Sequence, residues 1–560
     1  MSTRLTVSVP ARTDALIRQA AALLARRLAE RGEAEARIVE GTPPPAAGVA
    51  AVHLSVSRGL SADGYEVRAA GDGGVRIAGG NPAGVLYGVG KFLRTSQFGG
   101  DGRLHCGWQG GAAPAKPMRG IYFASHFHNF YHDAPVGAVE RYIEELSLWG
   151  INALAVWFDM HHYNGLQDPA AQAMVARLKA FLRAGRRVGM QVGLIGLANE
   201  AYANSPVELR ADWTAGHDGY HHPPGGHYHV EICPSKPGGT ERILADFAEK
   251  LDAFAEERPD FIWIWPYDQG GCTCAACAPW GVNGFLRLAR PVAETYKARV
   301  PEGKVILSTW YFDHFTDGEW AGLAKAFRTP PPWVDYLMAD DYGDQFPAFP
   351  REHGAPGGLP MVNFPEISMY QMGPWGGYGA NPLPAHLQRI WDSSRHLLSG
   401  GFPYSEGIFE DINKALCAQF CWHDAADARA IVREYAAGEF SPAVADDVVR
   451  SVAILEANHA RGWYGGGAGT RCELARTEGA AEARALLEAA DRRLPECVRR
   501  GWRWRILLLR AVIDAEFAAG NGVASERCEE AFQELIRIYC AENGEAAVRP
   551  PARKPIGGQS

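Results

Sequence analysis

The sequence predicts an α/β fold in three parts: a small N-terminal α/β domain, a central (β/α)8 TIM barrel and a C-terminal α-helical domain. Three observations lead to this prediction. A glycine-rich hairpin-and-helix pattern comes first, eight near-continuous apolar runs alternate with helical patterns after it, and only helical patterns follow. Such runs are typical of parallel strands that are buried on both faces. Eight of them over about 300 residues match a barrel better than an open doubly wound sheet.

Composition restricts the class of protein. The 560 residues are enough for two or three domains, and 47% hydrophobic with 21% charged residues is ordinary for a soluble globular chain. The net charge of −8, without a basic stripe, argues against a nucleic-acid partner. The chain starts without an apolar leader and has no stretch that could cross a bilayer, so we expect a cytoplasmic protein without a membrane partner. Eleven cysteines, an odd number, argue against a secreted disulfide framework.

Residues 1–112 are expected to form the first domain. The pattern predicts a helix over 13–32, a strand over 50–57, and a hairpin followed by a helix over 64–94. The segment 110–117, which contains glycine and proline, is the expected linker to the barrel.

The barrel is expected over residues 113–413. Its strands are the eight apolar runs, which cover residues 118–125, 151–159, 190–200, 261–268, 304–312, 334–342, 359–366 and 401–407. From 414 to 548 the pattern is helical, and strands are not expected there. The tail, 549–560, has the composition of a disordered segment.

Carboxylates recur where the predicted strands end, which is where barrels place their catalytic groups. Six of the eight runs end in an acid: Asp159, Glu200, Asp268, Asp340 with Asp341, Glu366 and Glu406. Cleavage of a glycosidic bond requires a pair of carboxylates, one to protonate the leaving oxygen and one to attack the anomeric carbon or activate water. Any one acid could instead cap the next helix, but capping does not explain six together. Binding of a divalent metal by the aspartates is a second alternative.

Aromatic and polar side chains near the same strand ends are the expected substrate-binding groups, because flat rings suit sugars and sugar hydroxyls need hydrogen-bond partners. These residues are His126, His128, Trp157, Asp159, Glu200, Trp310, Tyr342 and Trp375. For a single aromatic residue, packing within the barrel mouth is the alternative, and for the histidines it is metal binding. The histidine-rich stretch 216–229 also contains glycine and proline, which favours a loop that covers substrate over a metal site.

The stretch "GYEVR…GGVRIAGGNPAGVLYGVGKFLR", residues 64–94, resembles the small α/β domain that precedes the barrel in family 67 α-glucuronidases and family 20 hexosaminidases. The barrel opening "KPMRGIYF" and the helical C-terminal domain are similar to the family 67 layout. "EICPSKPGG" followed by "DQGGCTCAAC" resembles the cysteine-containing barrel pattern of a group that includes endo-acting N-acetylglucosaminidases of family 163. The resemblance covers the domain order of almost the whole chain and implies a glycoside hydrolase.

The family 67 layout implies particular roles. Its acid comes from the fourth strand and its water-activating carboxylates from the sixth and seventh, and those places here hold Asp268, Asp340 or Asp341, and Glu366. In family 20 an adjacent Asp–Glu pair ends the fourth strand, whereas this chain has Asp268–Gln269, and an amide cannot donate the catalytic proton. Few lysines or arginines follow the strands, so a neutral or unusual sugar fits better than a uronate.

We therefore expect a hydrolase of oligosaccharides or glycosides that needs no cofactor for its chemistry. Asp268 is the expected acid, with Glu366 and Asp341 as base or nucleophile and Glu406 in reserve. Two alternatives stay open: a catalytically inactive carbohydrate-binding barrel, which Gln269 favours, and a metal-dependent sugar-active enzyme that uses the histidines. Carbohydrate is the expected partner, and the sequence leaves a homodimer open.

Three cysteines follow the fourth run at CxCxxC spacing, as Cys272, Cys274 and Cys277. A structural zinc needs four ligands, so this motif alone does not define a site. Cys233 comes late in the loop after the third run, on the same face of the predicted barrel, and is the expected fourth ligand of a structural zinc. The alternative is four reduced, partly buried thiols. An iron–sulfur cluster or redox catalysis is less favoured because nothing else in the sequence indicates electron transfer.

Overall fold

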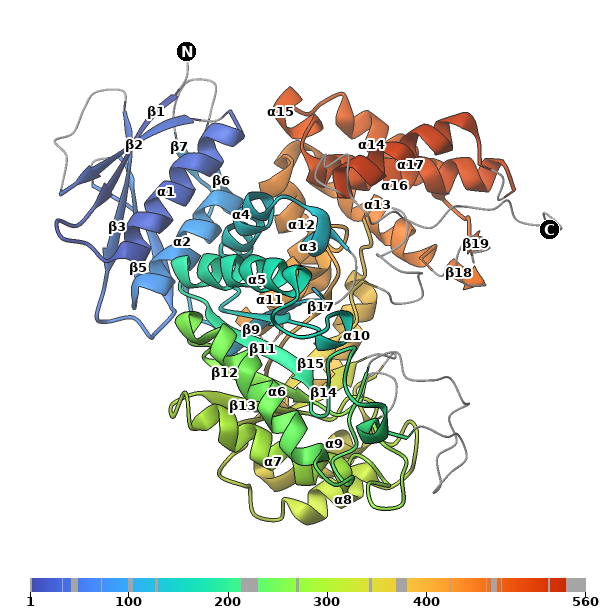
Figure 1. The fold of residues 1–560 in the computed structure, drawn as a ribbon. Helices are drawn as coiled ribbons and strands as arrows, with labels where there is room; N and C mark the ends of the chain where they lie inside the picture. Colours follow the sequence, from blue (N-terminus) through green and yellow to red (C-terminus); the bar gives the residue numbers. More distant parts are fainter. Residues whose placement is uncertain are drawn as a thin grey trace.

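The computed structural model of the chain has the three parts that the sequence predicts (Figure 1). It describes residues 3–539 except 33, 42–48, 72, 99–103, 126–128, 213–229, 268–270, 342–344, 369–379, 424, 460, 465–470, 475 and 522–523. The side chains of 341, 461–464 and 471–474 are also outside the description.

The N-terminal domain is a six-stranded sheet with two helices packed against it. Its sheet runs in the order β2-β1-β3-β5-β4-β8, with β4 antiparallel to both of its neighbours and the other pairs parallel. The elements are β1 (Thr3–Val9), α1 (Ala15–Glu30), β2 (Ala34–Glu40), β3 (Ala50–Val56), β4 (Tyr65–Ala69), β5 (Val75–Gly79), α2 (Pro82–Thr95), β6 (Ser96–Phe98), β7 (Leu104–Cys106) and β8 (Gly110–Ala112). Asn81 begins α2, because its side chain accepts a 2.7 Å hydrogen bond from the Gly84 amide.

The central domain is a closed parallel barrel, as predicted. In the described part of the chain, β10 to β16 follow one another around the barrel in sequence order, and β9 pairs with both β10 and β16 to close it. The strands are β9 (Met118–Phe123), β10 (Ala153–Trp157), β11 (Gln191–Leu197), β12 (Phe261–Trp265), β13 (Lys304–Ser308), β14 (Tyr336–Asp341), β15 (Met361–Pro365), β16 (Leu398–Gly401) and β17 (Tyr404–Ser405). The eighth position is shared by β16 and β17, which are separated by Phe402 and Pro403.

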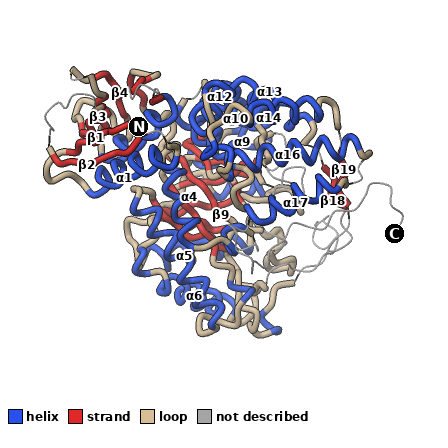
Figure 2. Tube along the Cα trace, turned by 90° about the horizontal axis from the view of Figure 1, so that it is seen from above, coloured by secondary structure: helices blue, strands red, loops and turns tan. Residues whose placement is uncertain are grey.

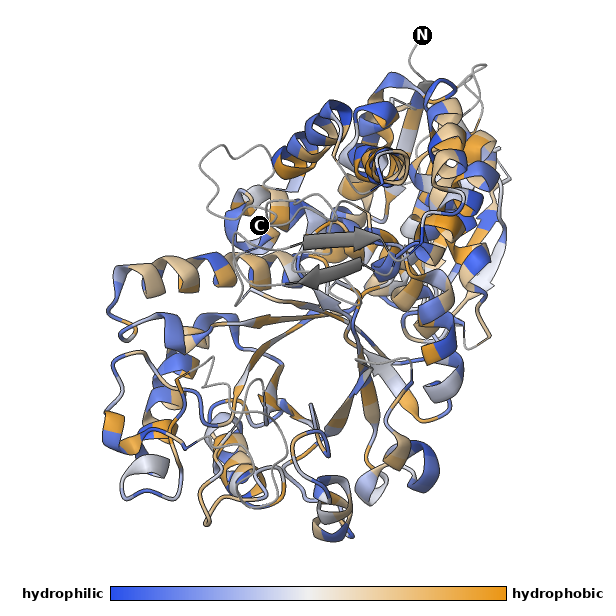
Figure 3. Cartoon of the chain, turned by 90° about the vertical axis from the view of Figure 1, so that its right-hand side faces the viewer, coloured by the Kyte–Doolittle hydropathy of each residue, from blue (hydrophilic) through white to orange (hydrophobic). Residues whose placement is uncertain are grey.

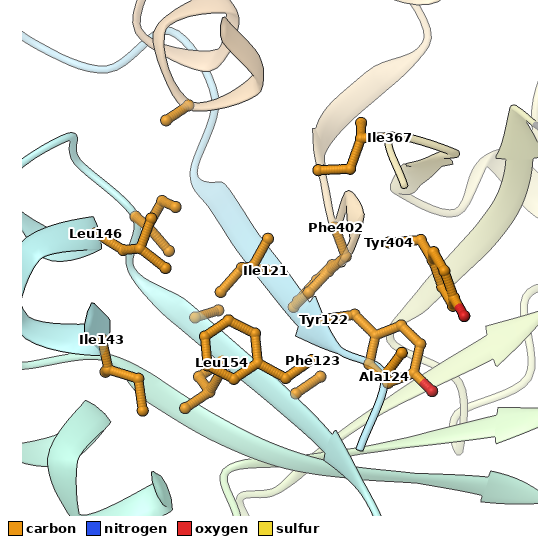
Figure 4. Packing of buried hydrophobic residues seen from close by; sticks show 14 of the residues in the cluster. Ile121, Tyr122, Phe123, Ala124, Ile143, Leu146, Leu154, Ile367, Phe402 and Tyr404 are labelled. Carbon is orange, nitrogen blue, oxygen red and sulfur yellow. The ribbon is translucent and has the colours of Figure 1, made fainter. Parts of the chain in front are cut away.

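Helices surround the barrel, and stripes of hydrophobic and hydrophilic residues run along them (Figure 3). They are α3 (Phe130–Asp133), α4 (Val136–Ser147), α5 (Pro169–Arg187), α6 (Gly239–Ala253), α7 (Gly284–Lys297), α8 (Glu319–Ala326), α9 (Ala348–His353), α10 (Pro384–Ser394) and α11 (Asp411–Trp422). Successive side chains of β9 point to opposite sides of the strand (Figure 4). Ile121 packs toward Ile143 and Leu146 of α4, whereas Tyr122 lies toward Tyr404. Alternation along the strand thus separates the outer core from the barrel interior.

Glycines make room for large rings in the lower part of the barrel. A Cβ atom on Gly120 would come within 2.2 Å of the Phe402 ring, and one on Gly193 within 2.2 Å of the Phe261 ring. Phe261 and Phe402 meet with their ring centres 5.6 Å apart. The interior is therefore a packed core and not a channel, so chemistry is confined to the end of the barrel where the loops are.

The C-terminal region is mostly helical, with one departure from the prediction. Its helices are α12 (Ala428–Glu439), α13 (Ala445–Ala457), α14 (Ala480–Asp491), α15 (Glu496–Arg499), α16 (Trp502–Ala519) and α17 (Glu526–Tyr539), which Figure 2 shows from above. Strands were not expected after residue 413, yet β18 (Arg461–Tyr464) and β19 (Arg471–Leu474) form an antiparallel hairpin. None of the described helices is long and apolar enough to cross a membrane.

Buried charges join the three parts. Arg27 of α1 forms a 2.7 Å ion pair with Glu439 of α12, so the N-terminal domain contacts the helical region directly. Arg503 of α16 lies 2.8 Å from Glu145 of α4 and 2.8 Å from Asp411 of α11. Burial alone would raise the pKa of Glu439, but Arg27, Arg503 and Arg31 outweigh it and hold that pKa at about 2.

Candidate active site

Two buried glutamates meet at the C-terminal ends of β15 and β17. Glu366 directly follows β15, and its backbone forms a parallel β-bridge with Tyr404 of β17. Glu406 follows β17, and its Oε1 atom accepts a 2.8 Å hydrogen bond from the Tyr404 hydroxyl. Each glutamate is 2% exposed. Burial is the main cause that raises the pKa of Tyr404 well above its ordinary value, and the negative charges of Glu406 and Glu366 raise it further. Both carboxylates therefore lie close enough to act on the same hydroxyl.

Five buried aromatic side chains, which we call the aromatic floor, lie beside these glutamates: Trp157, Trp265, Trp310, Phe364 and Tyr404. The ring centre of Trp265 lies 5.4 Å from that of Trp310, 5.1 Å from Phe364 and 6.3 Å from Trp157. Phe364 lies 5.9 Å from Tyr404. The strands thus bring Trp157 and Trp310, two of the predicted substrate-binding residues, into one cluster of packed aromatic rings beside the glutamates.

Trp265 is a site residue that sequence reasoning missed. It is 3% exposed, and its indole N–H has no acceptor among the described residues. A buried N–H group normally has a partner, so this donor is suited to a substrate oxygen. Trp263 and Trp265 share one face of β12, because residues two apart in a strand point the same way. That alternation was the signal that could have identified it.

Asp340 is the other acid of β14, and the sequence left the choice between it and Asp341 open. Asp340 is in register with Phe364 on the neighbouring parallel strand, so both side chains face the barrel interior. Burial raises the pKa of Asp340 to about 6. A carboxyl group with that pKa is partly protonated near neutral pH and can donate a proton. The side chain of Asp341 lies outside the described part of the structure.

The loop that carries Glu406 is held by Glu410 at the start of α11. One oxygen, Oε1, accepts hydrogen bonds from the Glu406 and Gly407 amides at 2.9 and 3.0 Å and from the Ser405 hydroxyl at 2.7 Å. Lys414, one turn later, lies 3.6 Å from the Glu410 carboxylate and donates to the Gly407 carbonyl. Glu410 is therefore engaged in positioning Glu406.

Two tyrosines from distant elements complete this support. The Tyr539 hydroxyl, at the end of α17, donates a 2.9 Å hydrogen bond to the Glu406 carbonyl. The Tyr131 hydroxyl, on α3, donates to the Gly407 carbonyl at 3.1 Å. The last described helix of the chain thus contacts the backbone of a predicted catalytic residue.

Glu200 makes its contacts within the protein. Its carboxylate accepts hydrogen bonds from the Trp157 indole at 3.1 Å and from the Met160 amide at 2.7 Å. Its other oxygen lies 3.2 Å from Nζ of Lys250, which is also buried. Glu200 therefore fixes the orientation of Trp157, one of the rings of the aromatic floor.

Asp159 lies beside two histidines that the sequence analysis did not name. Its Oδ1 atom is 2.5 Å from Nδ1 of His161, and Oδ2 is 3.6 Å from Nε2 of His162. These three side chains could in principle hold a metal ion. At 2.5 Å the aspartate and His161 are in direct contact, closer than the about 2.7–3.2 Å of an ordinary N–H···O hydrogen bond. The geometry thus favours an imidazole oriented by a carboxylate.

The two ends of the loop between β12 and α7 lie close together. Glu319, the first residue of α8, accepts hydrogen bonds from the Tyr267 hydroxyl and from the Gly281 amide, the latter at 2.6 Å. The Trp280 indole donates to the Pro266 carbonyl at 2.6 Å. Burial raises the pKa of Glu319 to about 7 against the effect of these donors. Both ends of the loop are therefore held together by one buried carboxyl group.

The same loop carries the cysteine motif, and the structure brings all four predicted cysteines together. The sulfur atoms of Cys233, Cys272, Cys274 and Cys277 lie within 4.8 Å of one another. The Cys233 sulfur is 3.7 Å from that of Cys274 and 3.8 Å from that of Cys277. Cys233, Cys272 and Cys277 are fully buried, whereas Cys274 is partly exposed.

Several predicted site residues fall outside the described part of the chain. They are His126, His128, Asp268, Tyr342 and Trp375. Of the remaining predictions, Glu366 and Glu406 are brought together, and Trp157 and Trp310 join the aromatic floor. Asp340, which the sequence offered beside Asp341, is a candidate acid, and the structure adds Tyr404 and Trp265.

Comparisons with known proteins find a similar fold among solved structures of glycoside hydrolases. No family model matches the sequence, and no curated protein matches it. Among solved structures, the chain is similar to a family GH115 4-O-methyl-α-glucuronidase with specificity for decorated arabinogalactans, at 12% identity and a TM-score of 0.65, over 100% of this chain and 81% of that one.

Two further structures share the fold. A family 89 glycoside hydrolase from Clostridium perfringens is 11% identical with a TM-score of 0.61, over 94% of this chain and 64% of that one. A family 20 β-N-acetylglucosaminidase is 16% identical with a TM-score of 0.52, over 77% and 92%. The expected resemblance to the hexosaminidase and glucuronidase group is thus confirmed at the level of the fold.

Proposed function

We propose that the chain is a glycoside hydrolase that cleaves an oligosaccharide or glycoside by paired-carboxylate catalysis. One observation carries the proposal: Glu406 accepts a hydrogen bond from the Tyr404 hydroxyl, Glu366 forms a β-bridge to Tyr404, and both lie beside an aromatic floor at the C-terminal end of the barrel strands. Glycosidic cleavage needs two carboxylates beside a sugar ring, and this pair lies where barrels place their catalytic groups.

The remaining roles follow from protonation. Glu406, which accepts a hydrogen bond from Tyr404, is the candidate base or nucleophile, with Glu366 as its partner. Asp341 stays a further candidate for that role. The proton for the leaving oxygen comes from Asp268 or from Asp340, whose raised pKa of about 6 suits a general acid.

The fold likeness supports the reaction class and leaves the sugar open. The three similar structures are named for activities on a glucuronoside or on N-acetylglucosamine-type substrates, or as a glycoside hydrolase, and each is less than 20% identical to this chain. The neutral or unusual sugar expected from the scarcity of basic residues at the strand ends stays a prediction.

The test is a screen of aryl glycosides and natural oligosaccharides with the wild-type chain and with Glu406→Gln, Glu366→Gln, Asp340→Asn and Asp268→Asn. Glu456→Gln is the matched control. This glutamate lies on α13 and also accepts two backbone hydrogen bonds, from the Ala385 and His386 amides at the start of α10. We expect the Glu406 and Glu366 variants to lose at least about a hundredfold in kcat/KM and the control to keep its activity.

Two results would contradict the proposal. If both glutamate variants turn over a substrate as the wild type does, the carboxylate pair is not catalytic. If the wild-type chain binds sugars and cleaves none of them, the barrel is a carbohydrate-binding protein.

If a substrate is cleaved, the stereochemistry of the product, followed by NMR, will assign a retaining or inverting mechanism.

A further inference from the structure

We propose that Cys233, Cys272, Cys274 and Cys277, the cysteine cluster, bind one zinc ion with a structural role. Zinc bound by four thiolates is tetrahedral with zinc–sulfur distances of about 2.3 Å, which places the sulfurs about 3.8 Å apart. The observed separations of 3.7 Å and 3.8 Å from the Cys233 sulfur match that spacing. All four sulfurs lie within 4.8 Å of one another, so a single ion can reach each of them.

Other cysteine chemistry fits this geometry less well. The sulfurs of a disulfide are about 2.0 Å apart and come in pairs, whereas here the Cys233 sulfur lies at nearly equal distances from two others. An iron–sulfur cluster places several metal atoms between its thiolates and so needs a wider set of sulfurs. A single tetrahedral ion is the arrangement that the spacing favours.

The surroundings of the cluster suit bound thiolates. The Ser235 hydroxyl lies 3.0 Å from the Cys277 sulfur, and Arg287 at the start of α7 lies 3.8 Å from the same sulfur. Arg287 also donates a 2.5 Å hydrogen bond to Ser235, which orients the hydroxyl. Four thiolates and one zinc ion carry a net charge of −2, and groups that donate hydrogen bonds to the sulfurs stabilise such a centre.

The ion would join two loops at the functional end of the barrel. Cys233 comes from the segment after β11, where its amide donates to the Leu209 carbonyl at 2.8 Å. The other three ligands come from the loop after β12, in which the Thr273 amide donates to the Asp212 carbonyl at 2.8 Å. Four protein ligands leave no open position, so this zinc is structural and does not touch substrate.

The position of the cluster suggests what the zinc does for the proposed reaction. In the sequence Asp268 lies between Tyr267, which is held by Glu319, and Cys272. Fixing Cys272 would limit the segment that presents the candidate acid. This consequence rests on the proposed function, whereas the presence of zinc does not, so the two can fail separately.

The decisive measurement is metal content by mass spectrometry, on the full chain purified without chelator from zinc-supplemented cells. We expect one zinc per chain in the wild type, and most of it lost in Cys274→Ser, which changes the least buried ligand. Cys497→Ser is the matched control, because it removes an exposed cysteine far from the cluster and should keep one zinc per chain. Wild-type protein that contains no zinc, or iron in its place, would overturn the assignment.

Cobalt provides a second measurement that does not depend on whether Cys274→Ser folds. Wild-type protein exchanged with Co²⁺ should show the visible bands of tetrahedral cobalt together with a sulfur-to-cobalt charge-transfer band in the near ultraviolet. Cys274→His should keep the metal and weaken the charge-transfer band, because one thiolate is replaced by an imidazole. Octahedral cobalt spectra in the wild type would show that the four thiolates do not bind one ion.

Discussion

At the scale of the residue, the acids at the end of the barrel differ in what surrounds them. Glu200 is paired with the buried Lys250, and Glu410 lies near the buried Lys414, so both have cationic neighbours. Asp340 differs, because burial is what raises its pKa. A neighbouring cation favours the charged form of a carboxyl group, whereas the loss of water favours the protonated form. The surroundings thus suit Glu410 to positioning and, in the proposed mechanism, Asp340 to proton transfer.

A pH profile tests whether Asp340 supplies the proton. The reacting form of a general acid is protonated, so kcat/KM should fall as pH rises through about 6, by about tenfold for each further pH unit. Asp340→Asn should lower kcat/KM by about 10²- to 10⁴-fold and remove this limb of the profile. An unchanged basic limb in Asp340→Asn, with activity lost in Asp268→Asn, would assign the proton to Asp268.

The unsatisfied donor of Trp265 leads to a second prediction at this scale. Trp265→Phe keeps an aromatic ring in the floor and removes the indole N–H, which has no acceptor in the described part of the chain. If that N–H donates to substrate, KM should rise roughly two- to tenfold, as expected for one hydrogen bond, while the melting temperature changes little. Steady-state kinetics and thermal unfolding measure the two effects. An unchanged KM would mean that the donor does not reach the sugar.

At the scale of the element, the strands were more predictable than their supports. Parallel strands buried on both faces produce apolar runs, so each strand end, and Glu366 and Glu406 with it, could be located from the sequence. Residues that join distant segments leave no such local pattern. The Tyr539 hydroxyl and the Glu406 carbonyl are 133 residues apart in the chain, and only the fold brings them to 2.9 Å. The cysteines were an exception, because their spacing is itself a ligand pattern.

The loop between β17 and α11 is the element on which we expect catalysis to depend most. Glu410→Ala would leave the Glu406 and Gly407 amides without their shared acceptor and would remove the Glu410 partner of Lys414, which keeps Asp411 nearby. Removing one partner of a buried ion pair destabilises a protein by about 3–5 kcal/mol. Because the loop carries Glu406, kcat should fall more than KM rises. Urea unfolding and steady-state kinetics would measure both.

Glu456→Ala is the control that separates stability from positioning. Glu456 also accepts two backbone amides, from Ala385 and His386, but it supports α10 and not the Glu406 loop. We expect it to lower stability and leave kcat unchanged below the unfolding temperature. Equal effects of the two variants on kcat would show that Glu410 acts only through general stability.

At the scale of the whole molecule, buried ion pairs make the three parts interdependent. Arg27 of the N-terminal domain pairs with Glu439 of the helical region at 2.7 Å. Arg503 of the helical region pairs with Glu145 of the barrel at 2.8 Å. Tyr539 of the helical region also contacts the Glu406 loop. Loosening of the helical region should therefore reach the candidate active site before the barrel itself unfolds.

Acid stability tests this interdependence through Glu439. Its pKa is about 2 in the folded chain against an ordinary 4.5, so its stabilising effect is fully present above 4.5 and is lost as pH falls toward 2. The difference corresponds to about 3 kcal/mol. Glu439→Gln should lower the melting temperature at pH 7 and flatten its decline between pH 4.5 and 2. Asp446→Asn, which breaks an exposed pair with Arg433, should change neither. A Glu439→Gln chain as stable as the wild type at pH 7 would mean that the Arg27–Glu439 pair does not hold the parts together.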